Sequence, residues 1–589
     1  MSFLKLLNYL NRRDWLYALC ALGFIVCGVW LDLSLPDYMR EVTTLVQTPG
    51  SELGAVLGAG SSMLLCALGS LAASAVVGYF VAQIAAGLAM RLREAVYDKT
   101  MDFSMEELGG FSTASLITRT TNDVQQIQMF VALGLQAILK APILAVWAIL
   151  KIAGKSWQWT AATGTAIAVL SAMLGAVIAL VLPKFNNMQK LTDGLNRVAW
   201  EHLTGIRVVR AYNAESYQEG KFQRANRALT DTCLFTSRTM SVLFPGMTLI
   251  MSGLTLSIYW IGAYLINAAA PAGRLSVFSD MVVFSSYAMQ IIMAFMMLVM
   301  TFIVLPRAIV SARRINEVLD TQSRITDGPA AGSELFEQGD VEFRHVCFRY
   351  PGSTQDVLHD VSFTAHRGET VAFIGSTGSG KSTLVNLIPR FYDVTGGEIL
   401  VDGINVRHYT QLALRRKLGY APQRAVLFRG TVATNVAYGD DGRGAVNSER
   451  LWNALDTAQM GVFVRQMENK DETPVAQGGS NLSGGQRQRL SIARAVYRRP
   501  EIYIFDDSFS ALDYRTDRAV REALKEEAGT ATTLIVAQRV GTILDADQII
   551  VLDEGRVVGK GRHRELLASC PVYREIAESQ LSKEELDHG

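Results

Sequence analysis

A glycine-rich run that ends in a lysine and two hydroxyl residues has the clearest chemistry in the sequence. Residues 375–383 match the pattern GxxxxGK(S/T) and follow Val371–Ile374, an apolar run that predicts a strand. Glycines let such a loop wrap a phosphate chain with backbone N–H groups, while Lys381 places a charge on the terminal phosphates and Ser382 offers a hydroxyl to Mg²⁺. A helix is expected to begin at Thr383. The predicted ligands of ATP and Mg²⁺ in this loop are Gly375, Ser376, Thr377, Gly378, Ser379, Gly380, Lys381, Ser382 and Thr383.

Two adjacent aspartates follow a second apolar run. Ile502–Phe505 predicts a buried strand, and Asp506 and Asp507 come directly after it. A strand that ends in a carboxylate beside a phosphate-binding loop is the arrangement that holds Mg²⁺ on a nucleotide. We therefore expect Asp506 to be the acidic group on the metal side.

A short glycine motif further along the chain carries a family resemblance. Asn481-Leu-Ser-Gly-Gly-Gln486, followed by Arg487-Gln-Arg-Leu490, resembles the signature of ABC ATPases. Tyr350 resembles the aromatic residue of that family that stacks on adenine. Gln423 resembles the glutamine of its Q-loop, which also serves Mg²⁺, and Ser510–Asp513 resembles its D-loop.

The resemblance covers the whole chain, because residues 118–123 and 201–210 are similar to the intracellular loops of exporter-type transmembrane domains. It implies two nucleotide-binding domains that meet head to tail, with each ATP held between one phosphate loop and the other chain's signature. The residues that would complete the partner's site are Ser483, Gly484, Gly485 and Gln486. One chain alone is not expected to hydrolyse ATP efficiently.

Two residues of the catalytic region depart from the family's pattern. The family usually has glutamate where this chain has Asp507, and histidine where it has Gln538. Aspartate is one methylene shorter, and a misplacement of about 1 Å can cost on the order of a hundredfold in rate. Gln538 cannot take the positive charge of a protonated histidine. We expect this chain's own site, with Asp507, Gln538 and Gln423 as catalytic residues, to bind ATP and hydrolyse it slowly.

The signature is intact, so the site that it completes on a partner can be fully active. This asymmetry predicts a heterodimer with a second, different ABC half-transporter that has the consensus glutamate and histidine. A homodimer that tolerates Asp507 and Gln538 is the alternative.

The first half of the chain is apolar enough to span a membrane repeatedly. Of the 589 residues, 49% are apolar and 19% are charged, and the apolar residues concentrate before residue 310. Stretches near or above the roughly 20 residues that a span needs lie at 14–35, 54–86, 132–154, 158–183, 242–268 and 279–307.

The distribution of basic residues predicts the topology of these spans. The intervals 87–130 and 184–240 are rich in Arg and Lys, whereas 36–53 and 269–278 carry only Arg40 and Arg274. The positive-inside rule then places both termini in the cytoplasm. Both basic intervals have helical periodicity, which predicts long cytoplasmic extensions that couple the domains; ordinary loops are the alternative. The absence of an Arg- and Ser-rich transit peptide favours a bacterial plasma membrane.

From residue 339 the pattern changes to strands that alternate with helices. The predicted strands are Val341–Tyr350, Thr370–Ile374, Glu398–Val401, Ile502–Phe505, Thr533–Val536 and Gln548–Leu552. The fold class is therefore an α-helical transmembrane domain of six helices plus an α/β P-loop ABC ATPase domain. The expected boundaries are 1–320 for the transmembrane domain, 321–338 for a linker and 339–589 for the nucleotide-binding domain.

Charge and cysteine usage exclude other classes of protein. The formal net charge of +1 gives no electrostatic case for nucleic-acid binding. The six cysteines are scattered, with no CxxC pair, and therefore read as small apolar residues. The predicted partners are the bilayer, a small amphipathic substrate and the second half-transporter, with no nucleic acid.

Methionines in the sixth stretch are the main clue to the substrate. Several lie at spacings of three and four, and flexible, polarisable Met side chains suit varied apolar ligands, although packing is an equally simple explanation. These residues are Met289, Met293, Met296, Met297 and Met300. Lys140 is taken as the one charge that enters a span, with its stem reaching the cytoplasmic interface.

The predicted function is ATP-driven export of amphipathic or lipophilic compounds, a multidrug-type role, by alternating access. The alternatives are an importer on the same fold, for example of a metal chelate, and a regulatory module gated by ATP. The six spans exclude a soluble ABC ATPase.

Overall fold

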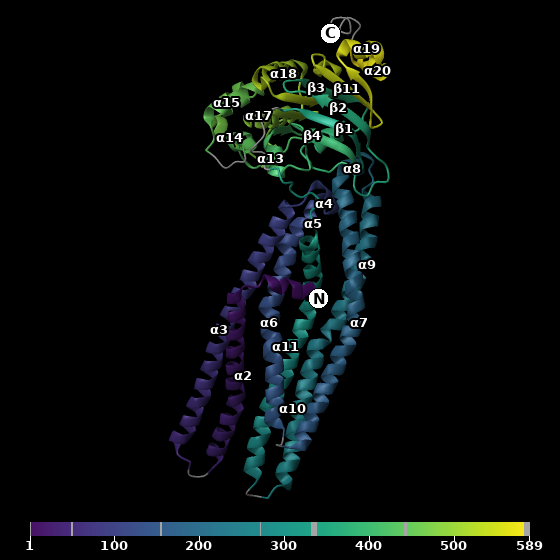
Figure 1. Ribbon diagram of the computed structural model, residues 1–589. Helices are drawn as coiled ribbons and strands as arrows, with labels where there is room; N and C mark the ends of the chain where they lie inside the picture. The colour runs from purple at the N-terminus through teal and green to yellow at the C-terminus, as the bar shows by residue number, and fades with distance from the viewer. Residues whose placement is uncertain are drawn as a thin grey trace. The chain divides into compact units, whose positions relative to one another are not determined.

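The computed structural model describes residues 2–48, 51–153, 156–270, 273–330, 339–440 and 445–581. Its chain divides into two compact units (Figure 1). The helical unit comprises Met1–Met101 and Thr113–Asp320, and the α/β unit comprises Asp102–Ser112 and Thr321–Gly589. Residues 331–338 of the predicted linker lie outside the described residues.

The helical unit contains six helices long and apolar enough to span a membrane, within the described part of the chain. They run over Arg12–Gln47, Leu53–Met101, Thr113–Ile152, Trp157–Lys184, Glu215–Ala268 and Arg274–Asp320. α3 (Leu53–Met101) has 49 residues, so it is about 74 Å long, more than twice the roughly 30 Å of a hydrocarbon core. The predicted helical extensions beyond a bilayer are therefore confirmed.

Most of these helices are single elements, and a few are broken by short turns. The elements of the helical unit are α1 (Ser2–Leu6), η1 (Leu7–Tyr9), α2 (Arg12–Gln47), α3, α5 (Thr113–Thr118), η2 (Arg119–Asp123), α6 (Val124–Ile152), α7 (Trp157–Thr204), α8 (Ile206–Ala211), α9 (Glu215–Ser241), α10 (Leu243–Ala268) and α11 (Arg274–Asp320). In Figure 1, α2 lies beside α3 and α7 lies beside α9, as their contacts also show. The core buries Phe284, Tyr287 and Ile291 of α11 against α2, α3, α6, α7 and α10.

Lys140 is paired with a carboxylate on a neighbouring helix, which corrects the expectation for this residue. Its ammonium lies 3.2 Å from the carboxylate of Asp32 on α2 and does not stand as a lone charge directed to an interface. An unpaired ammonium among apolar helices is energetically unfavourable, and the ion pair with a carboxylate on a neighbouring helix reduces this cost. Asp32 falls near the end of the predicted first span, and one sequence alone does not show which helices face each other.

The α/β unit contains two main sheets. Among its described residues, six strands follow the order β12 (Arg556–Gly561), β11 (Gln548–Asp553), β3 (Thr370–Gly375), β10 (Thr532–Val536), β9 (Ile502–Asp506) and β6 (Leu418–Ala421). Four antiparallel strands follow the order β2 (Leu358–Ala365), β1 (Val341–Phe348), β4 (Gly396–Val401) and β5 (Ile404–Asn405). β3, β6, β9, β10 and β11 are parallel to their neighbours, and β12 is an antiparallel edge. Parallel strands place their carboxyl ends along one edge, where α/β proteins bind ligands.

The predicted strands are all present, with small differences at their ends. Two further short strands, β7 (Gly430–Thr431) and β8 (Pro474–Val475), pair with each other. The sequence prediction missed β2, β5, β6, β7, β8 and β12, which are short or carry polar residues that blur the apolar pattern.

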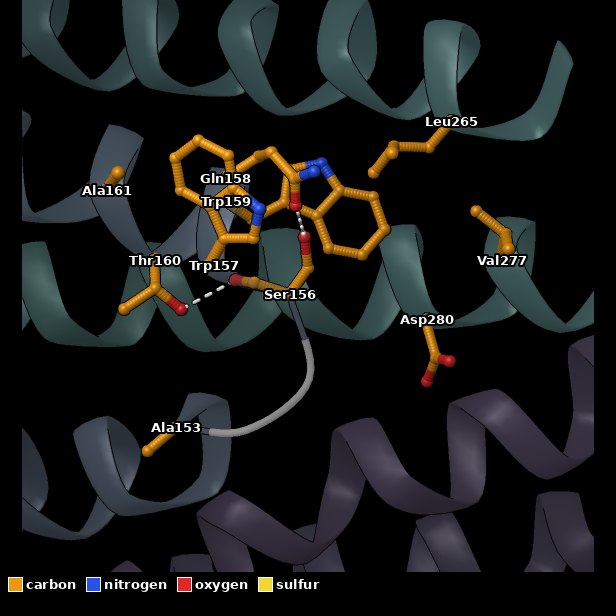
Figure 2. A pocket seen from close by; sticks show the side chains of 10 residues that line it. All are labelled: Ala153, Ser156, Trp157, Gln158, Trp159, Thr160, Ala161, Leu265, Val277 and Asp280. Atoms are coloured by element: carbon orange, nitrogen blue, oxygen red, sulfur yellow. Dashed lines mark hydrogen bonds between the residues drawn. The ribbon is translucent and has the colours of Figure 1, made fainter. Parts of the chain in front are cut away.

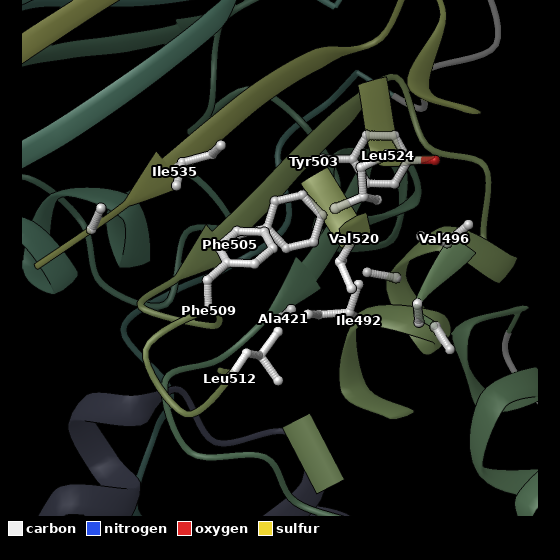
Figure 3. Packing of buried hydrophobic residues seen from close by; sticks show 14 of the residues in the cluster. Ala421, Ile492, Val496, Tyr503, Phe505, Phe509, Leu512, Val520, Leu524 and Ile535 are labelled. Carbon is white, nitrogen blue, oxygen red and sulfur yellow. The ribbon is translucent and has the colours of Figure 1, made fainter. Parts of the chain in front are cut away.

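Helices cover the sheet that carries the motifs. They are α12 (Lys381–Leu387), α13 (Gln411–Arg416), α14 (Val432–Ala437), α15 (Ser448–Thr457), α16 (Gly461–Gln466), α17 (Gly484–Tyr497), α18 (Tyr514–Ala528), α19 (His563–Ser569) and α20 (Pro571–Gln580). Figure 3 shows Phe505 of β9 against Phe509, with ring centroids 5.4 Å apart, among Ile492 of α17 and Val520 of α18. This packing fixes the strand whose end carries Asp506 and Asp507.

Candidate functional site

The phosphate-type loop lies between β3 and α12. α12 begins at Lys381, two residues before the predicted start, because helix ends are uncertain by one or two residues from any pattern. A Cβ at Gly380, where φ is +95°, would come within 2.7 Å of Leu358 Cδ2, so only glycine fits there. The loop from Gly375 to Lys381 therefore has its backbone fixed by its glycines.

Lys381 lies within its own loop. Its Nζ donates to the carbonyls of Gly375 at 2.9 Å and Ser376 at 2.7 Å, and to Ser379 Oγ at 3.3 Å. In the described part of the chain no carboxylate lies within ion-pair distance of this ammonium. Burial accordingly lowers the pKa of Lys381 below its ordinary value.

Strand register brings the acidic pair to this loop. β10 lies between β3 and β9, and Val536 of β10 pairs with Asp506 of β9. Ser382 Oγ donates to Asp506 Oδ1 at 2.7 Å, so the predicted hydroxyl and carboxylate for Mg²⁺ are in contact. Burial, helped by the charge of Asp507, raises the pKa of Asp506.

Three predicted catalytic residues meet at one oxygen. Asp507 Oδ2 accepts from Gln538 Nε2 at 2.7 Å and from Gln423 Nε2 at 3.2 Å. Asp507 is 6% exposed and has a φ of +48°, a left-handed conformation that is uncommon outside glycine. Its burial raises its pKa, although the hydrogen bonds from Gln423 and Ser510 partly oppose that rise. The contribution of Ser510, whose Oγ donates to the carbonyl of Asp507 at 3.0 Å, was not predicted from the sequence.

The charges of this site fit a nucleotide and its metal. Lys381 is a buried cation surrounded by neutral oxygens, and Asp506 and Asp507 are buried acids whose ionisation burial opposes. Buried charges are costly unless paired. A terminal phosphate beside Lys381 would balance its positive charge. Mg²⁺ held by Ser382 and Asp506 would balance the negative charge of the acids. The residues present therefore suit ATP with Mg²⁺.

Tyr350 and the signature take separate positions. Tyr350 OH lies 2.9 Å from Thr383 Oγ1, which places this predicted adenine-stacking residue beside the loop. Ser483 caps α17, with its Oγ accepting from Gln486 N and its own N–H donating to Gln486 Oε1. Among the described residues, no hydrogen bond or ion pair joins Ser483–Gln486 to the loop at 375–383.

A segment between α3 and α5 belongs to the α/β unit, although the sequence prediction assigned it to the transmembrane domain. In α4 (Met105–Gly110), Glu107 Oε1 accepts from Arg324 N at 3.1 Å, and Glu106 pairs with the guanidinium of Arg324 at 2.6 Å. Burial opposes ionisation of Glu107, but hydrogen bonds from Ser104 and Arg324 outweigh it and lower its pKa. The spacing Ser104-x-x-Glu107, a capping box, is the signal that could have found this element.

Comparison with known proteins agrees with this geometry. Residues 358–510 match the ABC transporter family, and residues 19–295 match the ABC transporter transmembrane region. An uncharacterized ABC transporter ATP-binding protein of Mycobacterium tuberculosis is 43% identical over 531 residues, covering 90% of this chain and 89% of the relative. The ATP-dependent lipid A-core flippase of Aromatoleum aromaticum is 31% identical over 597 residues, covering 99% and 96%.

A solved structure covers nearly the full length. A bacterial Atm1-family ABC exporter with ATP bound superposes with a TM-score of 0.81 at 26% identity, over 98% of this chain and 99% of that one. The chain belongs to the ABC transporter family. It is a multi-pass membrane protein and an ATP-driven exporter, with an ATPase domain that implies binding of ATP and Mg²⁺. The expected fold is confirmed, and the comparisons favour the exporter over the importer alternative.

Proposed function

We propose that this chain is the slow-site subunit of a heterodimeric exporter of amphipathic or lipophilic compounds. The observation that carries the proposal is the environment of Asp507. Its Oδ2 already accepts two amide hydrogen bonds, from Gln423 and Gln538. These two bonds hold the carboxylate in place, and aspartate is one methylene shorter than glutamate, so the carboxylate reaches less far toward an attacking water than a glutamate would.

The intact signature supports the asymmetry. Ser483 is the N-cap of α17, whose 14 residues present backbone N–H groups at its start. A partner with consensus glutamate and histidine would gain a complete site from this helix. This chain would receive in return only a site that holds ATP, with Lys381, Ser382 and Asp506 as its ligands.

Vanadate trapping tests the proposed asymmetry, because vanadate traps nucleotide at sites that have hydrolysed it. The purified complex is incubated with a photoreactive ATP analogue, Mg²⁺ and vanadate, and each subunit is separated and its label counted. We expect label to accumulate on the partner's phosphate loop in the presence of vanadate. The label on this chain should stay at the level seen without vanadate. Equal vanadate-dependent label on both subunits would overturn the slow-site proposal.

The substrate class rests on side chains of the helical unit. Met293 of α11 is 47% exposed, while Met289, Met296 and Met297 are partly buried, and the side chain of Met300 lies outside the described residues. A separate cavity of about 910 Å³ lies at the start of α7, where Leu265 of α10 and Asp280 of α11 also line it (Figure 2). Trp157, Gln158 and Asp280 line it, so aromatic and polar groups occur together. A mixed lining of this kind suits an amphipathic molecule.

The lipid relatives support the same class, since a lipid A-core flippase is named for an amphipathic cargo. We place the protein in a bacterial plasma membrane with both termini cytoplasmic. The complex is reconstituted in liposomes, and ATP-dependent movement of a fluorescent lipophilic dye and of a fluorescent phospholipid is followed. Movement of either would support the proposal. ATP binding without substrate-stimulated turnover would favour the regulatory alternative.

A further inference from the structure

α2 contains a proline in its interior, and one of its carbonyls loses its helical partner. Pro36 is buried within the 36-residue helix Arg12–Gln47. Proline has no N–H, so the carbonyl four residues earlier, that of Asp32, receives no intrahelical hydrogen bond. Within an apolar bundle, water is not freely available to replace that bond. Something else in the protein must serve the freed group.

Two side chains of α11 serve the backbone at this break. Gln290 Nε2 donates to the carbonyl of Asp32 at 3.2 Å. Tyr287 OH lies 3.0 Å from the carbonyl of Leu33 and 2.7 Å from Asp37 Oδ1, and its single proton serves one of them at a time. Because residues three apart share a helix face, both side chains reach α2 from the same side of α11. Tyr287 is fully buried.

Within the part of the chain that the structure describes, the bond to Asp32 is the one hydrogen bond of the Gln290 amide. Its Oε1 is buried without a hydrogen bond among the described residues. An unsatisfied buried acceptor is unfavourable, so the hydrogen bonding of the amide oxygen does not explain why the side chain takes this position. The bond from Nε2 to the Asp32 carbonyl, the one that proline frees, explains it.

Acidic groups on either side of Pro36 are paired with α6. Asp32 pairs with Lys140 at 3.2 Å, and Asp37 pairs with Lys151 at 2.7 Å. These side chains are partly exposed, between 19% and 44%. Near the proline break α2 is thus held by polar contacts to both α6 and α11, and beyond it Arg40 also pairs with Asp280 of α11 at 3.3 Å.

We propose that Gln290 and Tyr287 are positioning residues for transport. They hold the segment of α2 after Pro36 against α11, and this segment turns about Pro36 when their hydrogen bonds break. This inference rests on the proposed transport function. The freed carbonyl has two alternative partners, the amide of Gln290 in a dry interface and water in an opened one. Entry of water as this interface opens therefore stabilises the released state, which makes the break a two-state element.

A disulfide cross-link between α2 and α11 reports on this contact directly. Thr44 Oγ1 and Ser279 Oγ lie 3.3 Å apart, beyond Pro36 along α2, so cysteines at these positions are within bonding reach. The cross-linking rate of Thr44→Cys/Ser279→Cys is measured in the assembled complex, with the native cysteines replaced, without nucleotide and after trapping with ATP and vanadate. We expect trapping to slow the cross-link.

A double-mutant cycle then tests the role of Gln290. Gln290→Leu should slow the nucleotide-free cross-link by about fivefold, the effect of one lost hydrogen bond, and bring it close to the trapped rate. Pro36→Ala restores an N–H that can bond the Asp32 carbonyl, so in that background Gln290→Leu should change the rate less than twofold. Tyr287→Phe should slow the cross-link in the proline background. Ile309→Leu, at an exposed position of the same helix, is the control and should have no effect.

An equal effect of Gln290→Leu in both backgrounds would overturn the proposal, because the side chain would then act by packing alone. A cross-link rate insensitive to trapping would overturn it too. The double-mutant cycle uses the rate of disulfide formation, which can be measured even in a complex that transports no dye. Failure of the proposed function therefore shows in the transport assay, and failure of this inference shows in the cycle.

Discussion

Replacing Asp507 by glutamate and Gln538 by histidine should accelerate the site built on this chain. The added methylene moves the carboxylate outward by about 1.5 Å. A displacement of about 1 Å in a positioned group is worth up to a hundredfold in rate, which corresponds to about 2.7 kcal/mol of activation free energy. Asp507 is 6% exposed, so the larger side chain must displace the amides of Gln423 and residue 538. Overpacking costs about 1–3 kcal/mol, and we therefore expect a net gain nearer tenfold than hundredfold.

The assay must isolate this site from its partner's. ATP turnover is measured in the assembled complex after the partner's catalytic glutamate has been replaced by glutamine, so that the remaining hydrolysis comes from Asp507 or its substitute. Asp507→Glu alone should give part of the gain, Asp507→Glu/Gln538→His the whole, and Asp507→Asn none. Unchanged turnover in the double variant, with ATP still bound, would refute the kinetic role assigned to these residues.

Three further outcomes follow from the same geometry. ATP at a hundredfold excess over Kd should stabilise this chain by about 2.7 kcal/mol, and Lys381→Ala should abolish that stabilisation. Thermal unfolding with and without Mg·ATP measures it. An unchanged rise in unfolding temperature in the variant would contradict the role of the loop. Because burial raises the pKa of Asp506 and Asp507, protons compete with Mg²⁺ at a higher pH than for ordinary carboxylates. Mg·ATP affinity, measured by fluorescence titration, should fall as pH drops from about 8 to about 5, and a flat profile would argue against these pKa shifts. Ser483→Ala removes the N-cap of α17, costing about 1 kcal/mol, and should slow vanadate-dependent labelling of the partner without changing ATP binding to this chain.

The chemistry of the ATP site was readable from the sequence because its residues are close together along the chain. Gly375–Thr383 is one continuous loop, and Asp506 ends one strand, so local pattern and mechanism point to the same place. The register of β3, β9 and β10 then brings them together, as parallel strands with a common carboxyl edge require.

Contacts between distant helices could not be read in the same way. Lys140 pairs with the carboxylate of Asp32, and Gln290 binds the backbone carbonyl of the same residue. Both contacts join residues more than 100 positions apart. Hydropathy locates spans and says nothing of which faces meet. The predicted first span ends at residue 35, so Pro36 falls in the interval that follows it; the helix in fact continues to Gln47, which places the proline in its interior.

We propose that this chain works beside a different subunit, and the composition of the intact complex tests this directly. The chain is tagged, purified in mild detergent from its native host, and the intact complex is weighed by native mass spectrometry. We predict a one-to-one complex with a second ABC half-transporter that has glutamate and histidine where this chain has Asp507 and Gln538. A complex containing only copies of this chain would contradict the claim, and both its sites would then be slow.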